Sequence, residues 1–302
     1  MRMAVIGPGT IGTHVALLGA RRGFQVDLIG RDAERARVAL NRAIDSTGER
    51  TAGALIEIRT DLTHAVAEAD IIYEAIHERL EEKRALYAEI EPAVKSAVPI
   101  VSGTSTIGPV ELGAELLHGD RVFVAHFVHP VTTVALAEVI EPPTPQPAAH
   151  ATFRAWIDAM GLAPMVLDRA ITGFIVNRLQ FALLREALSL VANGVAEARD
   201  IDRVITDGLG PRWVATGPLA SMDIGGIELF RDVARLVAPT LENGTMIEHL
   251  SALIERGATG ALSGQGTRAW TAADRQHAAD ARKRSYAFAA ELHAEGPIPN
   301  DG

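Results

Sequence analysis

The feature that most constrains the fold lies at the start of the chain, where an apolar run leads into a glycine-rich turn. Met3 to Ile6 is apolar, the next residues read Gly7-Pro8-Gly9-Thr10-Ile11-Gly12, and apolar residues then recur at helical spacing. A strand, a G-x-G-x-x-G turn and a helix in this order are typical of a dinucleotide-binding βαβ unit, in which the helix N-terminus faces the phosphates. The candidate cofactor residues in this turn are Gly7, Gly9, Thr10, Ile11 and Gly12.

The residue after the second predicted strand bears on which dinucleotide binds. We expect this strand at Gln25 to Ile29, and an NAD site usually carries an acid near its end for the ribose 2′-hydroxyl. That position is Gly30, followed by Arg31. The missing carboxylate and the neighbouring guanidinium slightly favour a 2′-phosphate, and therefore NADP over NAD. Asp32 could serve NAD if the strand ends later, and Arg31 could be a solvated residue at a helix start.

Short apolar runs then alternate with helical patterns up to about residue 168. Further strands are predicted at 56–59, 71–75, 99–102, 122–124, 134–140 and 162–167. Such alternation predicts an α/β fold, a Rossmann-type doubly wound sheet, over residues 1–168. The alternation stops at residue 170, so an all-α substrate and dimerisation domain is predicted over 169–302. Its first helix, 174–191, is apolar nearly all round and is expected to be buried, and the tail 296–302 is expected to be frayed.

Two of the predicted strands carry a histidine and a glutamate. The apolar runs at 122–124 and 134–140 flank a short polar turn and are typical of adjacent buried strands. His126 follows the first run, and Glu138 lies in the second, twelve residues later (138 − 126). A carboxylate beside an imidazole fixes the tautomer of the ring and makes it a general base for a hydroxyl proton. The alternative is a core histidine with a satisfied hydrogen bond and an unrelated surface glutamate.

Other polar residues also follow predicted strands. Glu78 and Ser105 come shortly after the strands at 71–75 and 99–102. Ligands of doubly wound sheets gather beyond the carboxyl ends of the strands, so these residues and His126 could line one crevice. Each also has an ordinary interpretation, since Glu78 and Ser105 could simply cap helices or face solvent.

Composition excludes several classes of function. The 302 residues suit two domains, and the 48% hydrophobic content is ample for packed cores. The formal net charge of −9 argues against nucleic-acid and anionic-membrane partners. The absence of cysteine excludes disulfides, thiolate nucleophiles and thiolate metal sites. No apolar run approaches the roughly 18 residues that span a bilayer, and no signal core is evident, so we expect a cytoplasmic protein.

Taken together, these motifs resemble the L-3-hydroxyacyl-CoA dehydrogenase family. The similar features are the histidine followed by a proline and, twelve residues on, a glutamate, the Thr-Ser pair at 104–105, and Gly-Phe-Ile-Val-Asn-Arg at 173–178. The segments 177–181, 207–213 and 217–219 look most like the branch of lambda-crystallin, L-gulonate 3-dehydrogenase and carnitine dehydrogenase. The resemblance implies that Ser105 and Asn177 bind the substrate oxygen and that Glu78 and Lys83 flank the nicotinamide side of the cofactor.

The chain also departs from the family pattern. His129 stands where the family has an asparagine after the dyad histidine, and Arg79 stands where asparagine is common. Gly30 replaces the acid after the second strand. The helical arm that helps to hold CoA in the acyl-CoA enzymes has only residues 31–57 available and looks short.

We therefore predict an NAD(P)-dependent oxidoreductase that transfers a hydride between nicotinamide and the 3-hydroxy group of a small hydroxy acid. His126 exchanges the hydroxyl proton, Glu138 orients it, and Ser105 and Asn177 place the substrate. Arg212 beside Trp213, in a loop predicted at 208–213, could bind the free carboxylate by two parallel hydrogen bonds. It could equally be a surface arginine stacked on Trp213.

Two alternative functions, a candidate metal site and the oligomeric state also have to be considered. A short-chain L-3-hydroxyacyl-CoA dehydrogenase is the alternative enzyme, and the short arm argues against it. A non-catalytic dinucleotide-binding structural protein is the alternative of another class, and the intact set of polar residues argues against it. A metal site at His126 and His129 has no further ligand spacing to support it, so no metal is predicted. The resemblance implies a homodimer formed through the helical domain, which is rich in apolar residues such as Trp213, Leu229, Phe230 and Leu253.

Overall fold

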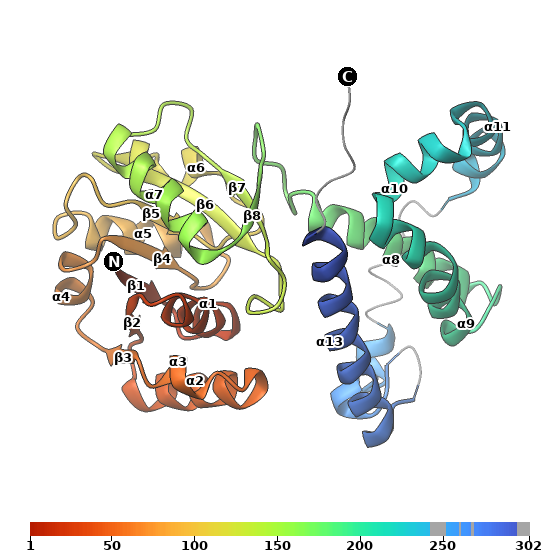
Figure 1. Ribbon diagram of the computed structural model, residues 1–302, viewed down its shortest axis with the longest axis horizontal. Helices are drawn as coiled ribbons and strands as arrows, with labels where there is room; N and C mark the ends of the chain where they lie inside the picture. Colours follow the sequence, from red (N-terminus) through yellow and green to blue (C-terminus); the bar gives the residue numbers. More distant parts are fainter. Residues whose placement is uncertain (242–251, 260, 267–268, 295–302) are drawn as a thin grey trace. The chain divides into compact units, whose positions relative to one another are not determined.

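A computed structural model describes residues 1–241, 252–259, 261–266 and 269–294, and Figure 1 shows its ribbon. The chain forms two compact units, Met1–Asn177 and Arg178–Gly302, which are described separately here. The first unit is a doubly wound α/β sheet and the second, where described, is helical, so the predicted fold class is confirmed. The tail 296–302 lies outside the described residues.

One sheet runs through the first unit. Its strands are β1 (Arg2–Ile6), β2 (Gln25–Ile29), β3 (Ile56–Arg59), β4 (Ile71–Glu74), β5 (Ile100–Ser102), β6 (Val122–Phe127), β7 (Leu136–Ile140) and β8 (Ala163–Val166). The spatial order is β3-β2-β1-β4-β5-β6-β7-β8. Neighbours pair in parallel except β6 and β7, which are antiparallel. The order reverses between β1 and β4, which is the position where doubly wound sheets bind ligands at the carboxyl ends of their strands.

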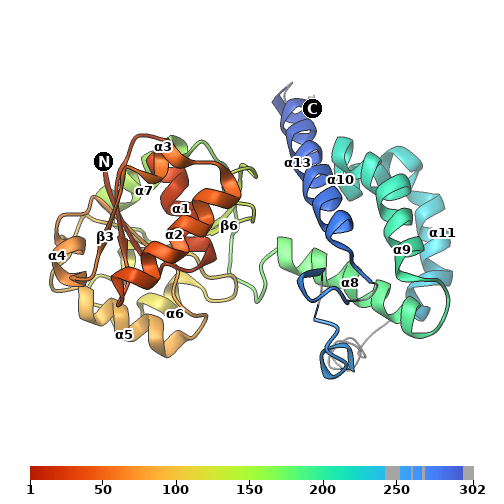
Figure 2. The same ribbon diagram turned by 90° about the horizontal axis from the view of Figure 1, so that it is seen from below.

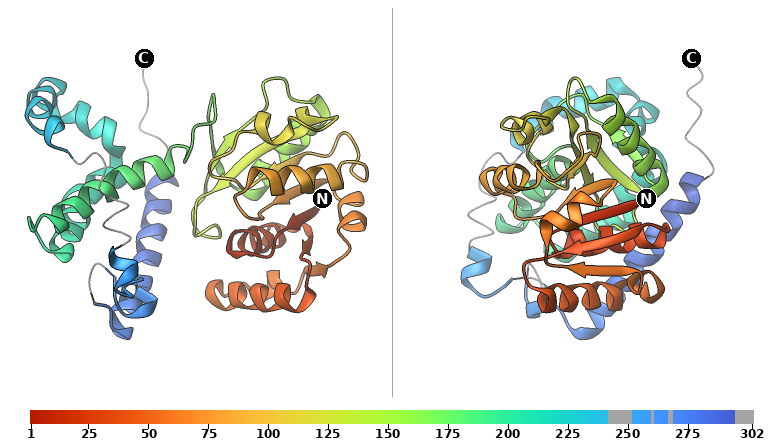
Figure 3. Two further views of the ribbon diagram at one scale, coloured as in Figure 1. Left: turned by 180° about the vertical axis from the view of Figure 1, so that it is seen from behind. Right: turned by 90° about the vertical axis from the view of Figure 1, so that its left-hand side faces the viewer.

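Helices cover both faces of this sheet (Figures 2 and 3). One group consists of α1 (Thr10–Arg21), α2 (Ala33–Thr47), α3 (Arg50–Gly53) and α7 (Pro147–Met160). The other consists of α4 (Leu62–Ala67), α5 (Leu80–Ile90) and α6 (Pro109–Gly113). Successive strand residues point to opposite faces, so Met3 and Val5 enter the core under the first group, while Ala4 and Ile6 enter the core under the second.

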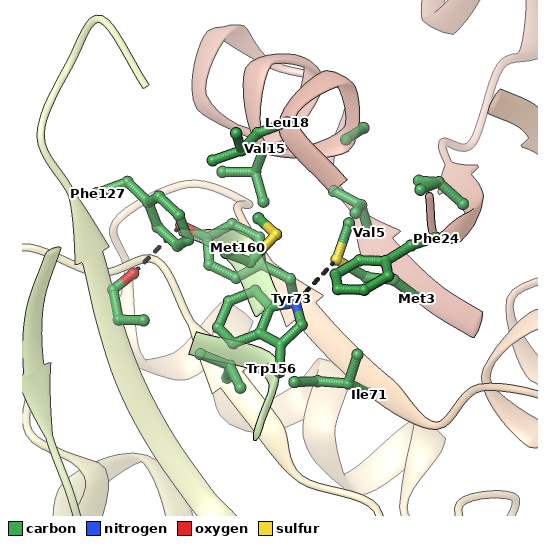
Figure 4. Packing of buried hydrophobic residues seen from close by; sticks show 14 of the residues in the cluster. Met3, Val5, Val15, Leu18, Phe24, Ile71, Tyr73, Phe127, Trp156 and Met160 are labelled. Atoms are coloured by element: carbon green, nitrogen blue, oxygen red, sulfur yellow. Dashed lines mark hydrogen bonds between the residues drawn. The ribbon is translucent and has the colours of Figure 1, made fainter. Parts of the chain in front are cut away.

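Large side chains fill the core under α1 and α7, as Figure 4 shows. Trp156 of α7 is fully buried, and its indole N–H points at the sulfur of Met3, 3.3 Å away. Tyr73 of β4 is also fully buried and lies against Trp156, with ring centroids 6.1 Å apart. Each such side chain contributes about 1.5–3 kcal/mol of hydrophobic free energy. This packing makes the sheet a rigid platform for the residues at its strand ends.

Where the structure describes the second unit, most of its residues lie in helices and helical turns. These include α8 (Val176–Ala192), which begins at the end of the first unit, α9 (Ala198–Arg203), a π-helical turn (Val204–Leu209), α10 (Gly210–Gly225), α11 (Ile227–Val237), two 3-10 turns (Ala238–Thr240 and Ala261–Ser263) and α13 (Ala272–Ala294). The predicted loop at 208–213 is wrong, because this segment is helical throughout. Pro211 is the second residue of α10, directly after the π-helical turn. The real interruption lies at Gly217, with φ 71°, followed by Pro218.

The prediction that α8 is buried is also wrong. Of the α8 side chains, all of which the structure describes, Ser189 alone is buried. Leu179 and Phe181 are more than half exposed, at 60% and 52%. Apolar residues on every side of a helix show that the helix favours burial, but they do not show which surface supplies the cover, and a single chain need not supply it.

Candidate active site

The antiparallel pairing of β6 with β7 sets a histidine directly opposite a glutamate. His126 faces Glu138 in the register of the two strands. The Nδ1 atom of His126 lies 2.8 Å from Oε2 of Glu138, and the carboxylate is fully buried while the ring keeps 15% of its surface exposed. A ring held through Nδ1 by a carboxylate presents Nε2 as its free nitrogen.

The second oxygen of Glu138 holds the start of α8. Its Oε1 accepts hydrogen bonds from the backbone N–H groups of Ile175 and Val176, at 2.7 and 2.9 Å. These are donors of a helix N-terminus, which have no partner within the helix and favour a negative charge. One carboxylate therefore fixes both the imidazole and the beginning of the helix that carries Asn177.

The residues just before α8 pack against the histidine. Gly173 and Phe174 both take positive φ values, 80° and 43°, and the latter is uncommon for a bulky residue. The fully buried ring of Phe174 meets the imidazole of His126 edge to face, with centroids 5.7 Å apart. The backbone N–H of Gly173 donates to the carbonyl of Ser105 at 3.1 Å. This short segment thus connects the Ser105 turn to the His126–Glu138 pair.

Glu78 organises the turn that follows β5. Its Oε1 accepts from the hydroxyl of Thr104 at 2.5 Å, the backbone N–H of Ser105 at 2.9 Å and the hydroxyl of Thr106 at 2.8 Å. Burial alone would raise the pKa of the Glu78 carboxyl, but these three hydrogen bonds and the nearby Lys83 ammonium outweigh it and lower the pKa. Glu78 is therefore ionised at neutral pH and keeps its acceptor role.

Sequence reasoning missed Glu74, the last residue of β4. Its carboxylate is fully buried and accepts from Lys83 Nζ at 2.6 Å, the backbone N–H of Ile76 at 2.7 Å, Tyr87 Oη at 2.8 Å and Ser102 Oγ at 2.7 Å. Lys83 itself is 1% exposed and lies between Glu74 and Glu78, the latter at 3.6 Å. A carboxylate that ends an otherwise apolar strand was the available signal, because a buried charge requires partners.

The glycine turn has the geometry that close approach of a dinucleotide requires. Gly7 has φ 103°, and a Cβ at this position would lie 2.6 Å from the carbonyl oxygen of Ala75. A Cβ at Gly12 would lie 2.0 Å from the carbonyl oxygen of Gly7, so α1 packs on the turn only with glycine there. A Cβ at Gly9 would meet nothing within 4 Å, so the space beside this residue is open to a ligand. Thr10 and Ile11 form the first turn of α1. This cradle fits the pyrophosphate of a nicotinamide dinucleotide.

Packing explains the glycine at the end of β2. Gly30 is buried, and a Cβ there would lie 2.9 Å from Cγ of Pro8 and 3.3 Å from Cβ of Ala36. Asp32, the alternative acid, caps α2 by accepting from the backbone N–H of Arg35 at 3.0 Å. Arg31 stands between these two residues and is exposed.

A cavity of about 370 Å³ lies between the start of α1 and α2. Its lining includes Gly9 and Thr10 from the cofactor turn, His14 from α1, and Arg42 and Ser46 from α2. His14 also meets the ring of His129 edge to face, with centroids 5.4 Å apart. The cavity combines a helix N-terminus with an arginine, which suits an anionic group.

The remaining candidate residues lie elsewhere in the chain. Asn177 is the second residue of α8 and is half-buried. Arg212 lies in the first turn of α10, in the second unit, and is exposed, with Trp213 half-buried next to it. Across the part of the chain that the structure describes, no three acidic or histidine side chains gather as metal ligands would. Over the same residues, no helix is both long and apolar enough to cross a membrane.

Comparison with known proteins identifies relatives along most of the chain. Residues 2–170 match the family described as 3-hydroxyacyl-CoA dehydrogenase, NAD binding domain, and residues 173–270 match the family described as its C-terminal domain. The chain is 32% identical over 250 residues to 5-formyl-3-hydroxy-2-methylpyridine 4-carboxylate 5-dehydrogenase of Mesorhizobium japonicum, covering 80% of this chain and 81% of that protein. It is 34% identical over 235 residues to L-carnitine dehydrogenase of Oceanobacillus iheyensis, covering 74% and 76%.

A solved structure agrees with the sequence relatives. The crystal structure of a 5-formyl-3-hydroxy-2-methylpyridine 4-carboxylic acid 5-dehydrogenase, described as an NAD+-dependent dismutase, superposes with a TM-score of 0.81 at 29% identity and covers 98% of this chain and 99% of that one. The resemblance predicted from the motifs is confirmed, including the branch that contains carnitine dehydrogenase. The chain belongs to the 3-hydroxyacyl-CoA dehydrogenase family and is a nicotinamide-dependent oxidoreductase that acts on CH–OH groups.

Proposed function

We propose that this enzyme transfers a hydride between a nicotinamide dinucleotide and the 3-hydroxy group of a small hydroxy acid that bears a free carboxylate. The observation that carries the proposal is the contact of 2.8 Å between His126 Nδ1 and the fully buried Glu138 carboxylate. A histidine oriented in this way is the general base that alcohol oxidation needs, and the general acid that carbonyl reduction needs.

The proton moves through one defined atom of His126. Because Glu138 accepts from Nδ1–H, Nε2 takes the proton from the substrate hydroxyl in oxidation and returns it in reduction. Glu138 then stabilises the imidazolium, and its hydrogen bonds to the start of α8 keep it from turning away. The nicotinamide, when bound, accepts or supplies the hydride.

Two further residues place the reacting carbon in this proposal. The Ser105 hydroxyl and the Asn177 amide donate to the substrate oxygen, which orients the carbon and stabilises the charge that develops on that oxygen. Support comes from the segment 173–176, which binds the Ser105 carbonyl at one end and Glu138 at the other. Asn177 follows this segment directly.

The cofactor residues in the proposal lie at the carboxyl edge of the sheet. Gly7, Gly9, Thr10, Ile11 and Gly12 cradle the pyrophosphate, and Glu78 accepts from the nicotinamide ribose with Lys83 behind it. We favour NADP slightly, because Gly30 has no acid, Asp32 is occupied in capping α2, and Arg31 offers a cation to a 2′-phosphate. The relative whose crystal structure is known is described as NAD+-dependent, so NAD is the alternative cofactor.

The names of the relatives support a carboxylate substrate. Both 5-formyl-3-hydroxy-2-methylpyridine 4-carboxylate and L-carnitine carry a free carboxylate. Arg212 is our candidate for the cation that binds this group in the present enzyme.

A short-chain 3-hydroxyacyl-CoA is the second candidate substrate. The cavity between α1 and α2, with Arg42 and Ser46 in its wall, favours it, because a CoA ester carries phosphates. A panel of 3-hydroxy acids and of acetoacetyl-CoA against both cofactors separates the two. Binding of NADH without any turnover would instead indicate a non-catalytic protein.

The first prediction concerns the histidine and its carboxylate. His126→Ala should lower kcat by roughly 10²–10⁴-fold with cofactor affinity kept, because the general base is lost. Glu138→Gln should lower kcat less, but it should also lower the melting temperature, since an amide has one acceptor oxygen for the donors that two oxygens now serve. Steady-state kinetics and thermal denaturation measure both. Turnover at the normal rate by the His126 variant would rule out the mechanism.

The second prediction concerns the cofactor. The wild-type enzyme should show the higher kcat/KM with NADPH, and Arg31→Ala should lower that value about tenfold while leaving the value for NADH unchanged. The two cofactors are compared in one assay at equal concentrations. A preference for NADH that does not respond to the Arg31 change would contradict the assignment.

The third prediction concerns the substrate carboxylate. Arg212→Met should raise KM for the hydroxy acid about a hundredfold, as loss of a charge-assisted contact does, with the cofactor KM unchanged. Met keeps most of the apolar stem of the side chain, so packing is largely preserved. Efficient turnover of acetoacetyl-CoA, together with an unaffected Arg212 variant, would favour the acyl-CoA alternative.

The fourth prediction concerns assembly. We propose a homodimer formed through the helical unit, because Leu229, Phe230 and Leu236 of α11 are 41–77% exposed in the single chain. Multi-angle light scattering should give twice the mass of the 32.1 kDa chain. A monomeric mass at micromolar concentration would remove this proposal.

A further inference from the structure

A network of charges holds the Ser105 turn, and its innermost residue, Glu74, has no role in the function proposed above. It begins with Glu74 at the end of β4, which is fully buried and carries a formal negative charge. An isolated buried carboxylate is strongly unfavourable, so its surroundings must compensate the charge. Here the compensation comes from one cation, Lys83, and from three hydrogen-bond donors.

The first route from Glu74 to the turn passes through side-chain charge. Lys83 Nζ binds Glu74 Oε1 at 2.6 Å and lies 3.6 Å from Glu78 Oε2. Glu78 turns its other oxygen to the hydroxyls of Thr104 and Thr106 and to the backbone N–H of Ser105. The Thr104 hydroxyl oxygen in turn accepts from the backbone N–H groups of residues 106 and 107. The three hydrogen bonds that Glu78 accepts from the turn depend on where Glu78 is held.

The second route is shorter and uses one serine. Ser102 Oγ donates to Glu74 Oε2 at 2.7 Å and accepts from the backbone N–H of Thr104 at 3.3 Å. The backbone of Glu74 contributes as well, since its carbonyl accepts from the N–H of Gly103 at 2.7 Å. Both routes end on the turn 103–107 and start at the same residue.

We propose that Glu74 is a positioning residue for Ser105, acting through Lys83 and Glu78 on one side and through Ser102 on the other. The proposal rests on the role assigned to Ser105 above. In this proposal Glu74 contacts neither substrate nor cofactor. Its negative charge holds the Lys83 ammonium in the position where that ammonium also attracts the Glu78 carboxylate. Lys83 is part of this positioning role, because its ammonium lies between the carboxylates of Glu74 and Glu78 and links the two side chains.

The test uses a charge-neutral double variant, Glu74→Gln with Lys83→Met. Removing one partner alone leaves an unpaired buried charge and lowers stability whatever the role of the pair, whereas removing both avoids that cost. The control is Asp27→Asn, which weakens the two ion pairs of another buried carboxylate of the same sheet, with Arg2 at 2.8 Å and Arg59 at 3.2 Å. No contact joins Asp27 to the turn 103–107 among the hydrogen bonds and ion pairs of the described residues.

The first measurement needs no substrate. Hydrogen exchange followed by mass spectrometry reports the amides of the turn, including the Ser105 N–H that Glu78 binds. We expect exchange over residues 103–107 to be about tenfold faster or more in the double variant and unchanged in Asp27→Asn. Unchanged exchange in the double variant would overturn the proposal. If that variant fails to fold, Ser102→Ala removes the second route alone and must speed exchange at the Thr104 amide.

The second measurement links the turn to catalysis. With 3-hydroxybutyrate as the probe, the double variant should lower kcat by about tenfold to a hundredfold, as a small misplacement of a positioning group does. In a Ser105→Ala background the same two changes should lower kcat by less than about threefold, because the group they position is gone. Additive losses would show that the charges act elsewhere and would overturn the proposal. Normal kcat in Ser105→Ala alone, with fast exchange in the double variant, would instead refute the role of Ser105 and leave the positioning of the turn intact.

Discussion

The structure of the site depends on the fully buried carboxylate of Glu138, which has donors on both of its oxygens. One oxygen meets His126, and the other meets the two backbone N–H groups that open α8. A carboxylate without such partners would be too costly to bury, so strand, histidine and helix start hold one another in place. The antiparallel turn from β6 to β7 is what makes this possible, because it places the two side chains opposite each other in register.

A second buried carboxylate of the sheet is held in a similar way. Glu74 terminates β4, is fully buried, and collects donors from α5 and β5, as Glu138 collects them from β6 and α8. Glu74 is the last residue of β4, whereas Glu138 lies in the middle of β7, opposite His126 near the end of β6. In both cases the hydrogen bonds of the carboxylate fix backbone outside its own strand, at the turn after β5 for Glu74 and at the start of α8 for Glu138. In the proposed function, the groups that act on a ligand are the His126 ring and the Ser105 turn. Glu138 contacts His126 directly, whereas Glu74 reaches the Ser105 backbone through Lys83 and Glu78. Buried charge thus supports the site, and the exposed groups are free for chemistry.

Much of this arrangement could be predicted from the sequence, and the exceptions share a cause. Apolar runs bounded by turns predicted the strands, and the spacing of His126 and Glu138 predicted their closeness, because adjacent strands bring such residues together. Glu74 could not be predicted as a hub, since one of its partners, Ser102, lies 28 residues away and is set by sheet order. The sequence predicted a loop around Pro211 because glycines and a proline suggest a break, although the helix continues through them. The exposure of α8 was missed because the apolar content of a helix does not show which other surface packs against it.

The glycine turn and the end of β2 show that local packing also limits cofactor recognition. Pro8 lies within the turn, and its ring occupies the space that a side chain at position 30 would need. An acid at position 30 would therefore require the ring of Pro8 to shift, whichever dinucleotide the enzyme uses. The nearby acid, Asp32, uses one of its carboxylate oxygens to cap α2. The proposal that Arg31 recognises the ribose side of the cofactor is consistent with this packing, because its side chain is exposed directly after Gly30.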